Sequence, residues 1–202
     1  MDLEGVEKLM SLRRLHMGGC SYLASAVIRK FDKVALRNLH NFCIPGSEIP
    51  YWFTPDELRF SRKKYDAIRS VIIAVVVSKN SQINQDSTLD ELPVIAEIEA
   101  KILRVTRTVY SHAMNLKGIP NTGDDQLYLC RYPDYHPLVS ILENDDKMQV
   151  VRRNPPFDPR IMLKKCGIHL IYENDDDYDG EEESLNENLH TVSNRIMRFV
   201  DS

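Results

Sequence analysis

The chain of 202 residues contains only four cysteines, and no two of them form a Cys-X-X-Cys pair. They are Cys20, Cys43, Cys130 and Cys166, which lie far apart along the sequence. Small secreted domains instead carry closely spaced cysteines that form a disulfide framework. We therefore expect free, buried thiols in a reducing compartment, which corresponds to a cytoplasmic or nuclear location.

The sequence also lacks a long hydrophobic run. Its longest unbroken apolar segment is VIIAVVV, residues 71–77, whereas a membrane-spanning helix needs about 20 apolar residues. The first ten residues, MDLEGVEKLM, are acidic and lack the apolar region of a secretory signal. No Asn-X-Ser/Thr glycosylation site is present. These absences predict neither a membrane segment nor a membrane partner.

Motifs for catalysis and ligand binding are absent as well. The chain has no glycine-rich phosphate loop, no Gly-X-Ser-X-Gly elbow and no His-Glu-X-X-His motif. His40 with Cys43, and Cys166 with His169, stand three positions apart in segments that we predict to be strands. Residues at that spacing point to opposite faces of a strand. We therefore expect no metal site and no cofactor.

Three carboxylates deserve separate consideration as acid–base groups, namely Asp124, Asp125 and Asp134. The first two follow a segment rich in glycine, proline and asparagine, where short carboxylates typically cap free backbone amides. No pattern in the sequence sets two carboxylates into a defined geometry. The sequence therefore gives no support for an enzyme.

Charge is distributed unevenly along the chain. The net charge of −4 arises from 26 basic and 30 acidic residues, and eight of these acids lie within residues 174–187, which contain no base. The rest of the chain therefore has 26 bases against 22 acids. Acidic runs are typical of solvated and disordered segments. The alternative is that this segment masks a basic face.

A basic cluster with two aromatic residues lies in LRFSRKKYDAIR, residues 58–69. Such a cluster can contact nucleic-acid phosphates, but it matches no defined nucleic-acid-binding motif. Lysines also protect edge strands from unwanted pairing. We interpret the cluster as a solvated strand edge or loop and do not expect a nucleic-acid partner.

The middle of the chain has the pattern of β-strands. In VIAEIEAKILRV, residues 94–105, small and apolar residues alternate with Glu97, Glu99 and Lys101, as in a half-buried strand. Short strands separated by turn signals favour an antiparallel sandwich or barrel. The predicted strands are 70–78, 94–105, 106–116, 126–132, 147–152 and 161–173. The predicted fold class is therefore mainly β, and of the two architectures we expect the antiparallel β-sandwich.

A repeat pattern precedes these strands. LRRLHMGGC, residues 12–20, fits the Leu-X-X-Leu-X-Leu-X-X-Cys pattern of a leucine-rich repeat, with Met17 as the third apolar residue. The alternative is an amphipathic helix over residues 6–15. A single repeat cannot bury its apolar face alone, because stacked neighbours must cover it. We therefore predict a terminal repeat remnant and connector at residues 1–39, followed by the sandwich at 40–177.

The C-terminal segment, residues 178–202, is predicted to be an acidic linker followed by an amphipathic helix. Its apolar residues recur every three or four positions, and acids precede the helix while arginines lie near its end. The stripe consists of Leu185, Leu189, Val192, Ile196 and Phe199. We expect it to pack on residues 70–78, which are apolar on both faces.

Two aromatic segments supply candidate partner-binding residues. The candidates in CRYPDYHPL, residues 130–138, are Tyr132, Tyr135 and His136, which stand beside or between two prolines. Tyrosines give large contact area at low entropic cost. The alternative is that both tyrosines fold back onto the sandwich. In NFCIPGSEIPYWF, residues 41–53, we expect Trp52 and its apolar neighbours to seat the first strand against the sandwich. An exposed Trp52 would instead indicate a binding role.

Several segments together resemble a known family. FCIPGSEIPYWF, residues 42–53, resembles the Cys-X-Pro-Gly-X-Glu-Ile-Pro-X-Trp-Phe signature of the post-LRR domain of plant TIR-type nucleotide-binding leucine-rich-repeat disease resistance proteins. QLYLCRY is similar to the family's Asp-His-Leu-X-Leu-X-Tyr segment, and LKKCGIHLIYEND, which starts at Leu163, is similar to its closing strand. LRRLHMGGCSYL resembles the last repeat of the solenoid. The domain is also called the C-terminal jelly-roll and Ig-like domain (C-JID).

The resemblance implies a jelly-roll or Ig-like sandwich attached to a repeat horseshoe. It implies a non-catalytic recognition module for plant defence and innate immunity, which contacts a pathogen effector protein together with the receptor's own leucine-rich repeats. IRSVIIAVVVS departs from the family's Gly-Phe-Ala strand, and effector-contacting loops vary, so no contact residue carries over. Two alternatives remain: a carbohydrate-binding jelly roll, and a structural cap that keeps the receptor autoinhibited.

Overall fold

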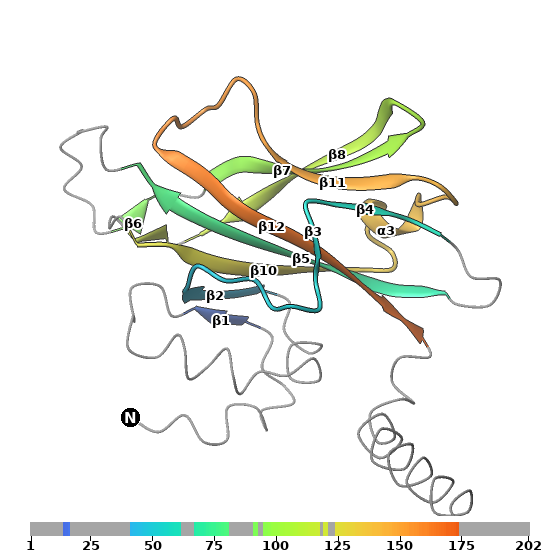
Figure 1. The fold of residues 1–202 in the computed structure, drawn as a ribbon, viewed down its shortest axis with the longest axis horizontal. Helices are drawn as coiled ribbons and strands as arrows, with labels where there is room; N and C mark the ends of the chain where they lie inside the picture. Colours follow the sequence, from blue (N-terminus) through green and yellow to red (C-terminus); the bar gives the residue numbers. More distant parts are fainter. Residues whose placement is uncertain are drawn as a thin grey trace, which may run out of the picture.

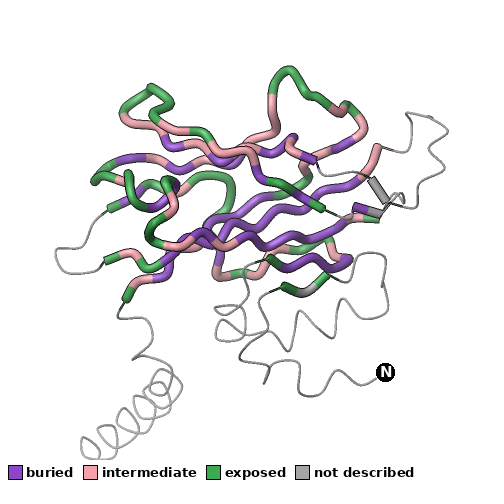
Figure 2. Tube along the Cα trace, turned by 180° about the vertical axis from the view of Figure 1, so that it is seen from behind, coloured by how far each residue is buried: buried purple, intermediate pink, exposed green. Residues whose placement is uncertain are grey.

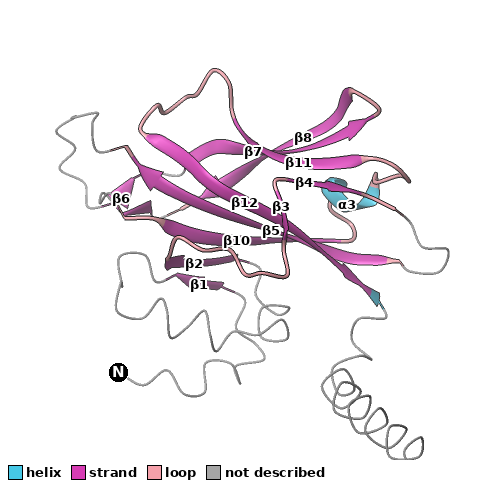
Figure 3. Ribbon diagram, viewed as in Figure 1, coloured by secondary structure: helices cyan, strands magenta, loops and turns pink. Residues whose placement is uncertain are grey.

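The computed structural model describes residues 14–16, 41–61, 67–80, 91–92, 95–117, 119–120 and 124–173. Within these residues the chain is mainly β, with two layers of strands and one short helix (Figures 1 and 3). No helix of the described part is both long and apolar enough to cross a membrane. Most of the repeat remnant, the acidic run and the predicted C-terminal helix lie outside the described residues, as do Cys20, His40 and residues 62–66.

The long strands occur where the sequence alternation predicts them. The elements are β1 (Arg14–His16), β2 (Asn41–Pro45), β3 (Thr54–Pro55), β4 (Glu57–Arg59), β5 (Ile68–Lys79), β6 (Glu91–Leu92), β7 (Ile95–Arg104), β8 (Arg107–Leu116), β9 (Ile119–Pro120), β10 (Gln126–Pro133), α3 (Pro137–Ser140), β11 (Lys147–Arg152) and β12 (Ile161–Tyr172). The six predicted strands correspond to β5, β7, β8, β10, β11 and β12, so these predictions are confirmed. β1 lies in the strand expected from the repeat pattern, and β2 lies in the expected strand that contains Cys43. The remaining short strands β3, β4, β6 and β9, and the helix α3, were not predicted.

The strands form two main sheets. Sheet A has the order β1-β2-β10-β5-β12-β3, and sheet B has the order β4-β11-β7-β8. A third sheet consists of β6 and β9 alone, and Ile119 of β9 joins the core. Every pairing is antiparallel except that of β1 with β2, which is parallel. Strand β5 is central in sheet A and pairs with β10 on one side and β12 on the other.

The core lies between sheets A and B. From β5 it takes Val71, Ile73, Val75 and Val77, and these pack with apolar residues of β7, β8 and β11 from sheet B. Each buried aliphatic side chain of this size stabilises the fold by about 1.5–3 kcal/mol. Figure 2 shows the continuous buried stretch through the central strands.

The opposite face of sheet A is also buried, as the apolar run at 70–78 predicts. Ile72, Ala74 and Val76 are at most 2% exposed although they point away from sheet B. Over β12 this face is covered by the segment that follows β2. A Cβ on Gly167 would lie only 2.9 Å from the Cβ of Phe53, so the segment packs as closely as a glycine permits.

One detail of the predicted alternation in β7 is wrong. The pairing of β7 with β8 shifts register between Ile95 and Ile98, so Ile95 rather than Ala96 joins the core. Glu97, which we expected on the solvent side, is 1% exposed. Its carboxylate accepts a hydrogen bond from the backbone N–H of Asp158.

Candidate partner-binding groove

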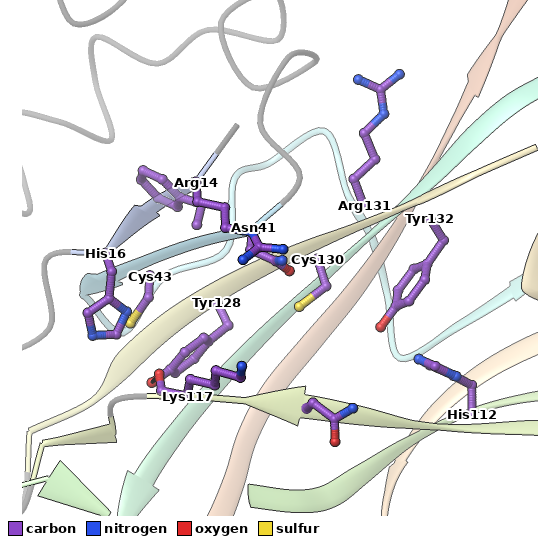
Figure 4. Close-up of a pocket in the computed structure, with 12 residues that line it drawn as sticks. Arg14, His16, Asn41, Cys43, His112, Lys117, Tyr128, Cys130, Arg131 and Tyr132 are labelled. Atoms are coloured by element: carbon purple, nitrogen blue, oxygen red, sulfur yellow. Dashed lines mark hydrogen bonds between the residues drawn. The ribbon is translucent and has the colours of Figure 1, made fainter. Parts of the chain in front are cut away.

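A groove of about 550 Å³ lies between one end of sheet A and strand β8 of sheet B (Figure 4). It borders β1, β2 and β10 on one side and β8 on the other. The described residues that line it are Arg14, His16, Asn41, Phe42, Cys43, His112, Asn115, Lys117, Tyr128, Cys130, Arg131 and Tyr132. Its volume lies within the range of about 300–1,000 Å³ that is typical of ligand sites.

Strand alternation determines which side chains of sheet A form one wall of the groove. Tyr128, Cys130 and Tyr132 occupy alternate positions of β10 and therefore face sheet B. The hydroxyl of Tyr128 donates a hydrogen bond of 3.1 Å to the backbone carbonyl of Lys117, which ties β10 to the end of β8 across the groove. Arg131 points away from Cys130 and Tyr132 (Figure 4). On that other face its Nε donates a hydrogen bond of 3.0 Å to Ser70 Oγ.

The charge of the groove is of one sign. None of the described residues that line it is acidic, whereas Arg14 and Lys117 are cationic and His16 adds a titratable ring. All three are exposed. Neither cation forms an ion pair with another described residue. The exposed mouth of the groove therefore favours a negatively charged ligand.

At the other end of the groove three rings form a cluster. The His112 ring lies 5.1 Å from Tyr132 and 4.7 Å from His136, and Tyr132 lies 4.7 Å from His136. Burial lowers the pKa of His112, and the nearby His136 lowers it further. Burial also lowers the pKa of His136 and raises the pKa of Tyr132. The cluster is therefore neutral near pH 7.

The three candidate residues in segment 130–138 differ in exposure and in their contacts. Tyr132 is 9% exposed and belongs to β10, so only one of the two tyrosines packs onto the sandwich, whereas the alternative expected both to do so. Tyr132 offers little contact area, because its position in β10 turns the side chain toward the core between the sheets. Tyr135 is 80% exposed. His136 begins α3, where its Nδ1 accepts a hydrogen bond from the backbone N–H of Leu138 at 3.2 Å.

Trp52 lies elsewhere, on the face of sheet A that points away from sheet B. Its ring stacks on Phe53 at 4.2 Å and meets His169 edge-on at 4.6 Å. His169 occupies the opposite face of β12 from Cys166 and Ile168, which belong to the core. The structure therefore separates Trp52 from the groove, and it places the ring in the seating role that we expected.

The described cysteines are buried and free, as the sequence predicts. They are Cys43, Cys130 and Cys166. Burial raises the pKa of Cys130 to about 12, with a further contribution from Cys43. Burial likewise raises the pKa of Cys166 to about 12, and its contact with Asp56 contributes. The thiols of Cys130 and Cys166 therefore remain protonated at neutral pH and are poor nucleophiles.

Sequence reasoning missed most residues of the groove, including Arg14, His16, His112, Asn115 and Lys117. One signal was available, because Arg14 and His16 flank Leu15 in the repeat pattern and therefore share a face of the predicted strand. A second signal was that His112 stands two positions from Tyr110 and two from Met114, so all three share one face of β8. Neither signal reveals that β1 and β8 border one groove.

Comparison of the chain with protein-family models, with curated proteins and with solved structures returned no match.

Proposed function

We propose that this chain is the post-LRR domain of a plant TIR-type disease resistance protein and that it recognises a pathogen effector by surface contact, without catalysis. Its sandwich is then a jelly-roll or Ig-like domain, it cooperates with the receptor's own repeats, and it works in the cytoplasm or nucleus. The observation that carries the proposal is the parallel pairing of β1 with β2. Arg14 pairs with Asn41, which is 27 positions further along the chain.

An offset of 27 residues falls within the period of leucine-rich repeats, about 20–29 residues. Consecutive repeats of that kind contribute parallel strands to one sheet, whereas all other strand pairs among the described residues are antiparallel. β1 also coincides with the predicted strand of the repeat pattern at 12–20. The pairing therefore supports a solenoid strand continued directly by the sandwich.

The two motifs most specific to the resemblance also contact each other. Phe53, from the motif at 42–53, packs against Gly167, from the segment that starts at Leu163. Two segments separated by more than 100 residues thus form one packing unit, which gives a structural reason for their joint occurrence.

The test is a pull-down of candidate effectors by this chain, with and without its native repeats. We expect an effector to be retained, and we expect Tyr135→Ala to weaken its retention. Tyr51→Ala is the matched control, because Tyr51 is 98% exposed and lies in a different segment. If no effector is retained in the presence of the native repeats, the proposal is wrong.

The β1–β2 pair also favours a second candidate, a structural cap that shields the last repeat and keeps the receptor autoinhibited. This function predicts normal effector retention by Tyr135→Ala. It also predicts self-activation of the full receptor when the β1–β2 joint is broken. The carbohydrate-binding alternative receives less support, because the exposed Tyr51, Tyr135 and Phe157 lie in three separate segments.

A further inference from the structure

One side of the sandwich is closed and the other is open. On the closed side, β3 of sheet A runs almost directly into β4 of sheet B, with Asp56 between them. On the other side sheet A ends in β2 and β1 and sheet B ends in β8. Among the described strands, none pairs with the outer edge of β8, and the groove lies on this open side.

Strand β8 offers an edge that is suited to pairing. It is ten residues long and pairs through one edge with β7, so its other edge presents alternating N–H and C=O groups. Its central stretch, residues 110–114, pairs with 98–102 in regular register. β8 contains neither lysine nor proline, the two residues that commonly protect an edge from another strand.

The groove follows this edge. His112 and Asn115 stand three positions apart in β8 and therefore belong to opposite faces of the strand, yet both line the groove. A groove that reaches both faces of an edge strand runs along its backbone. Tyr128 and Cys130 of β10 form the facing wall (Figure 4).

Charge and burial together identify the class of ligand. Arg14 and Lys117 stand at the mouth, and no described lining residue is acidic, so the groove selects negative charge. A single-stranded nucleic acid would need aromatic faces on which its bases stack. Tyr128 and Tyr132 are only 4% and 9% exposed and cannot serve in this way. An extended acidic peptide meets both the charge and the open backbone edge.

We propose that an extended, acid-rich segment of the partner protein binds in the groove by adding a strand to the outer edge of β8. Its backbone pairs with the edge, as in other cases of strand addition. Its carboxylates meet Arg14 and Lys117. The inference rests on the proposed function and specifies the chemistry of the segment that is recognised.

The experiment uses the full chain and a fluorescein-labelled nine-residue peptide of alternating glutamate and valine, with binding followed by fluorescence anisotropy. We expect saturable binding that weakens as salt increases. The double variant Arg14→Glu/Lys117→Glu is expected to weaken binding by roughly tenfold or more. The control Lys164→Glu makes the same kind of charge change at an exposed position of β12 and is expected to bind like the wild type.

Modified probes separate strand addition from plain charge attraction. A version of the peptide with N-methyl groups on alternate backbone nitrogens keeps all carboxylates but cannot complete the ladder, so we expect it to lose binding. Equal binding of both peptides would overturn the proposal. So would tighter binding of an oligothymidylate than of the peptide, which would indicate a phosphate-binding groove.

Two further comparisons complete the test. A chain ending at Glu173 should bind the peptide like the full chain; tighter binding by roughly tenfold would mean that the chain's own acidic run occupies the groove, and the proposal would be wrong. If Arg14→Glu/Lys117→Glu still retains an effector that wild type retains, the groove inference fails while the proposed function stands. If the peptide binds as expected but no effector is retained, the proposed function fails and the groove is still a peptide site.

Discussion

Trp52 and Tyr51 are neighbours in the sequence with opposite surroundings. Tyr51 is 98% exposed, whereas Trp52 is partly buried between Phe53 and His169. The two residues show that an aromatic pair in a proline-rich segment can contain one ring that holds the fold and one that faces solvent. Mutation of each ring measures this difference directly.

We predict that Trp52→Ala lowers the free energy of unfolding by about 1.5–3 kcal/mol, less than for a fully buried tryptophan, because part of the ring is exposed. Tyr51→Ala should change it by less than about 0.5 kcal/mol. Urea denaturation followed by circular dichroism measures both values. Equal effects of the two substitutions would contradict the seating role of Trp52.

Gly167 gives a second prediction for a single residue. A methyl group at this position would lie 2.9 Å from Phe53 Cβ and 3.2 Å from Ile49 Cγ2. Gly167→Ala should therefore destabilise the protein by about 1–3 kcal/mol through overpacking. Thr54→Ala, at an exposed position that pairs with the neighbouring Ile168, serves as the control in the same urea titration. An unchanged midpoint for Gly167→Ala would show that the segment over β12 packs loosely.

At the scale of elements, α3 begins at the ring cluster of His112, Tyr132 and His136, which lies at one end of the groove. His136 caps the helix through an unprotonated Nδ1, and its ring contacts His112 and Tyr132. The loop after α3 is tied to the β7–β8 hairpin, because Arg104 donates two hydrogen bonds of 3.0 Å to the buried carboxylate of Asp146. The β7–β8 hairpin is thereby tied to the loop between α3 and β11.

Protonation of His136 makes the stability of this region sensitive to pH. Its pKa is lowered in the folded protein, so the unfolded chain binds a proton more readily. The contribution of His136 to the free energy of unfolding is therefore fully present above about pH 6.5. It is lost as the pH falls toward the lowered pKa of the folded state. His136→Asn removes the titration and keeps a good capping acceptor.

We expect the wild type and His136→Asn to have similar melting temperatures near pH 7. As the pH falls below about 6.5, the wild type should lose more stability than the variant, because protonation breaks the cap and places a charge beside His112. Thermal unfolding at several pH values provides the measurement. Parallel pH profiles for the two proteins would refute the role of His136.

At the scale of the molecule, sheets A and B share one core. The central β5 contributes side chains both to that core and to the opposite face, where Trp52 lies over the neighbouring β12. Trp52 is the single tryptophan of the chain. Its fluorescence therefore reports on the face of sheet A that is farthest from sheet B.

We predict that the described sandwich unfolds as one unit. The urea transition seen by Trp52 fluorescence should coincide with that seen by circular dichroism of the strands, because loss of either sheet exposes the shared core. A fluorescence midpoint clearly below that of circular dichroism would show that the segment over β12 unfolds on its own.

The elements could be predicted from sequence to the extent that they depend on local alternation. The predicted strand at 147–152 coincides with β11, and that at 161–173 differs from β12 by one residue. The buried Glu97 could not be predicted, because it results from a register shift against β8 that depends on pairing with another strand. The helix α3 was missed because its four residues are too few for a helical period.

The sequence by itself determined the β class, the places of the long strands and the burial of the described thiols, because alternation of apolar residues and sparse cysteines are local properties. Only the tertiary structure decided that Tyr132 is buried while Tyr135 is exposed, and that Trp52 and the groove lie on different faces. It also decided which edges of the described strands pair with no other described strand. Arg14 of β1 and Lys117 beyond β8 meet at one groove through the order of strands in two sheets, and that order arises from long-range pairing.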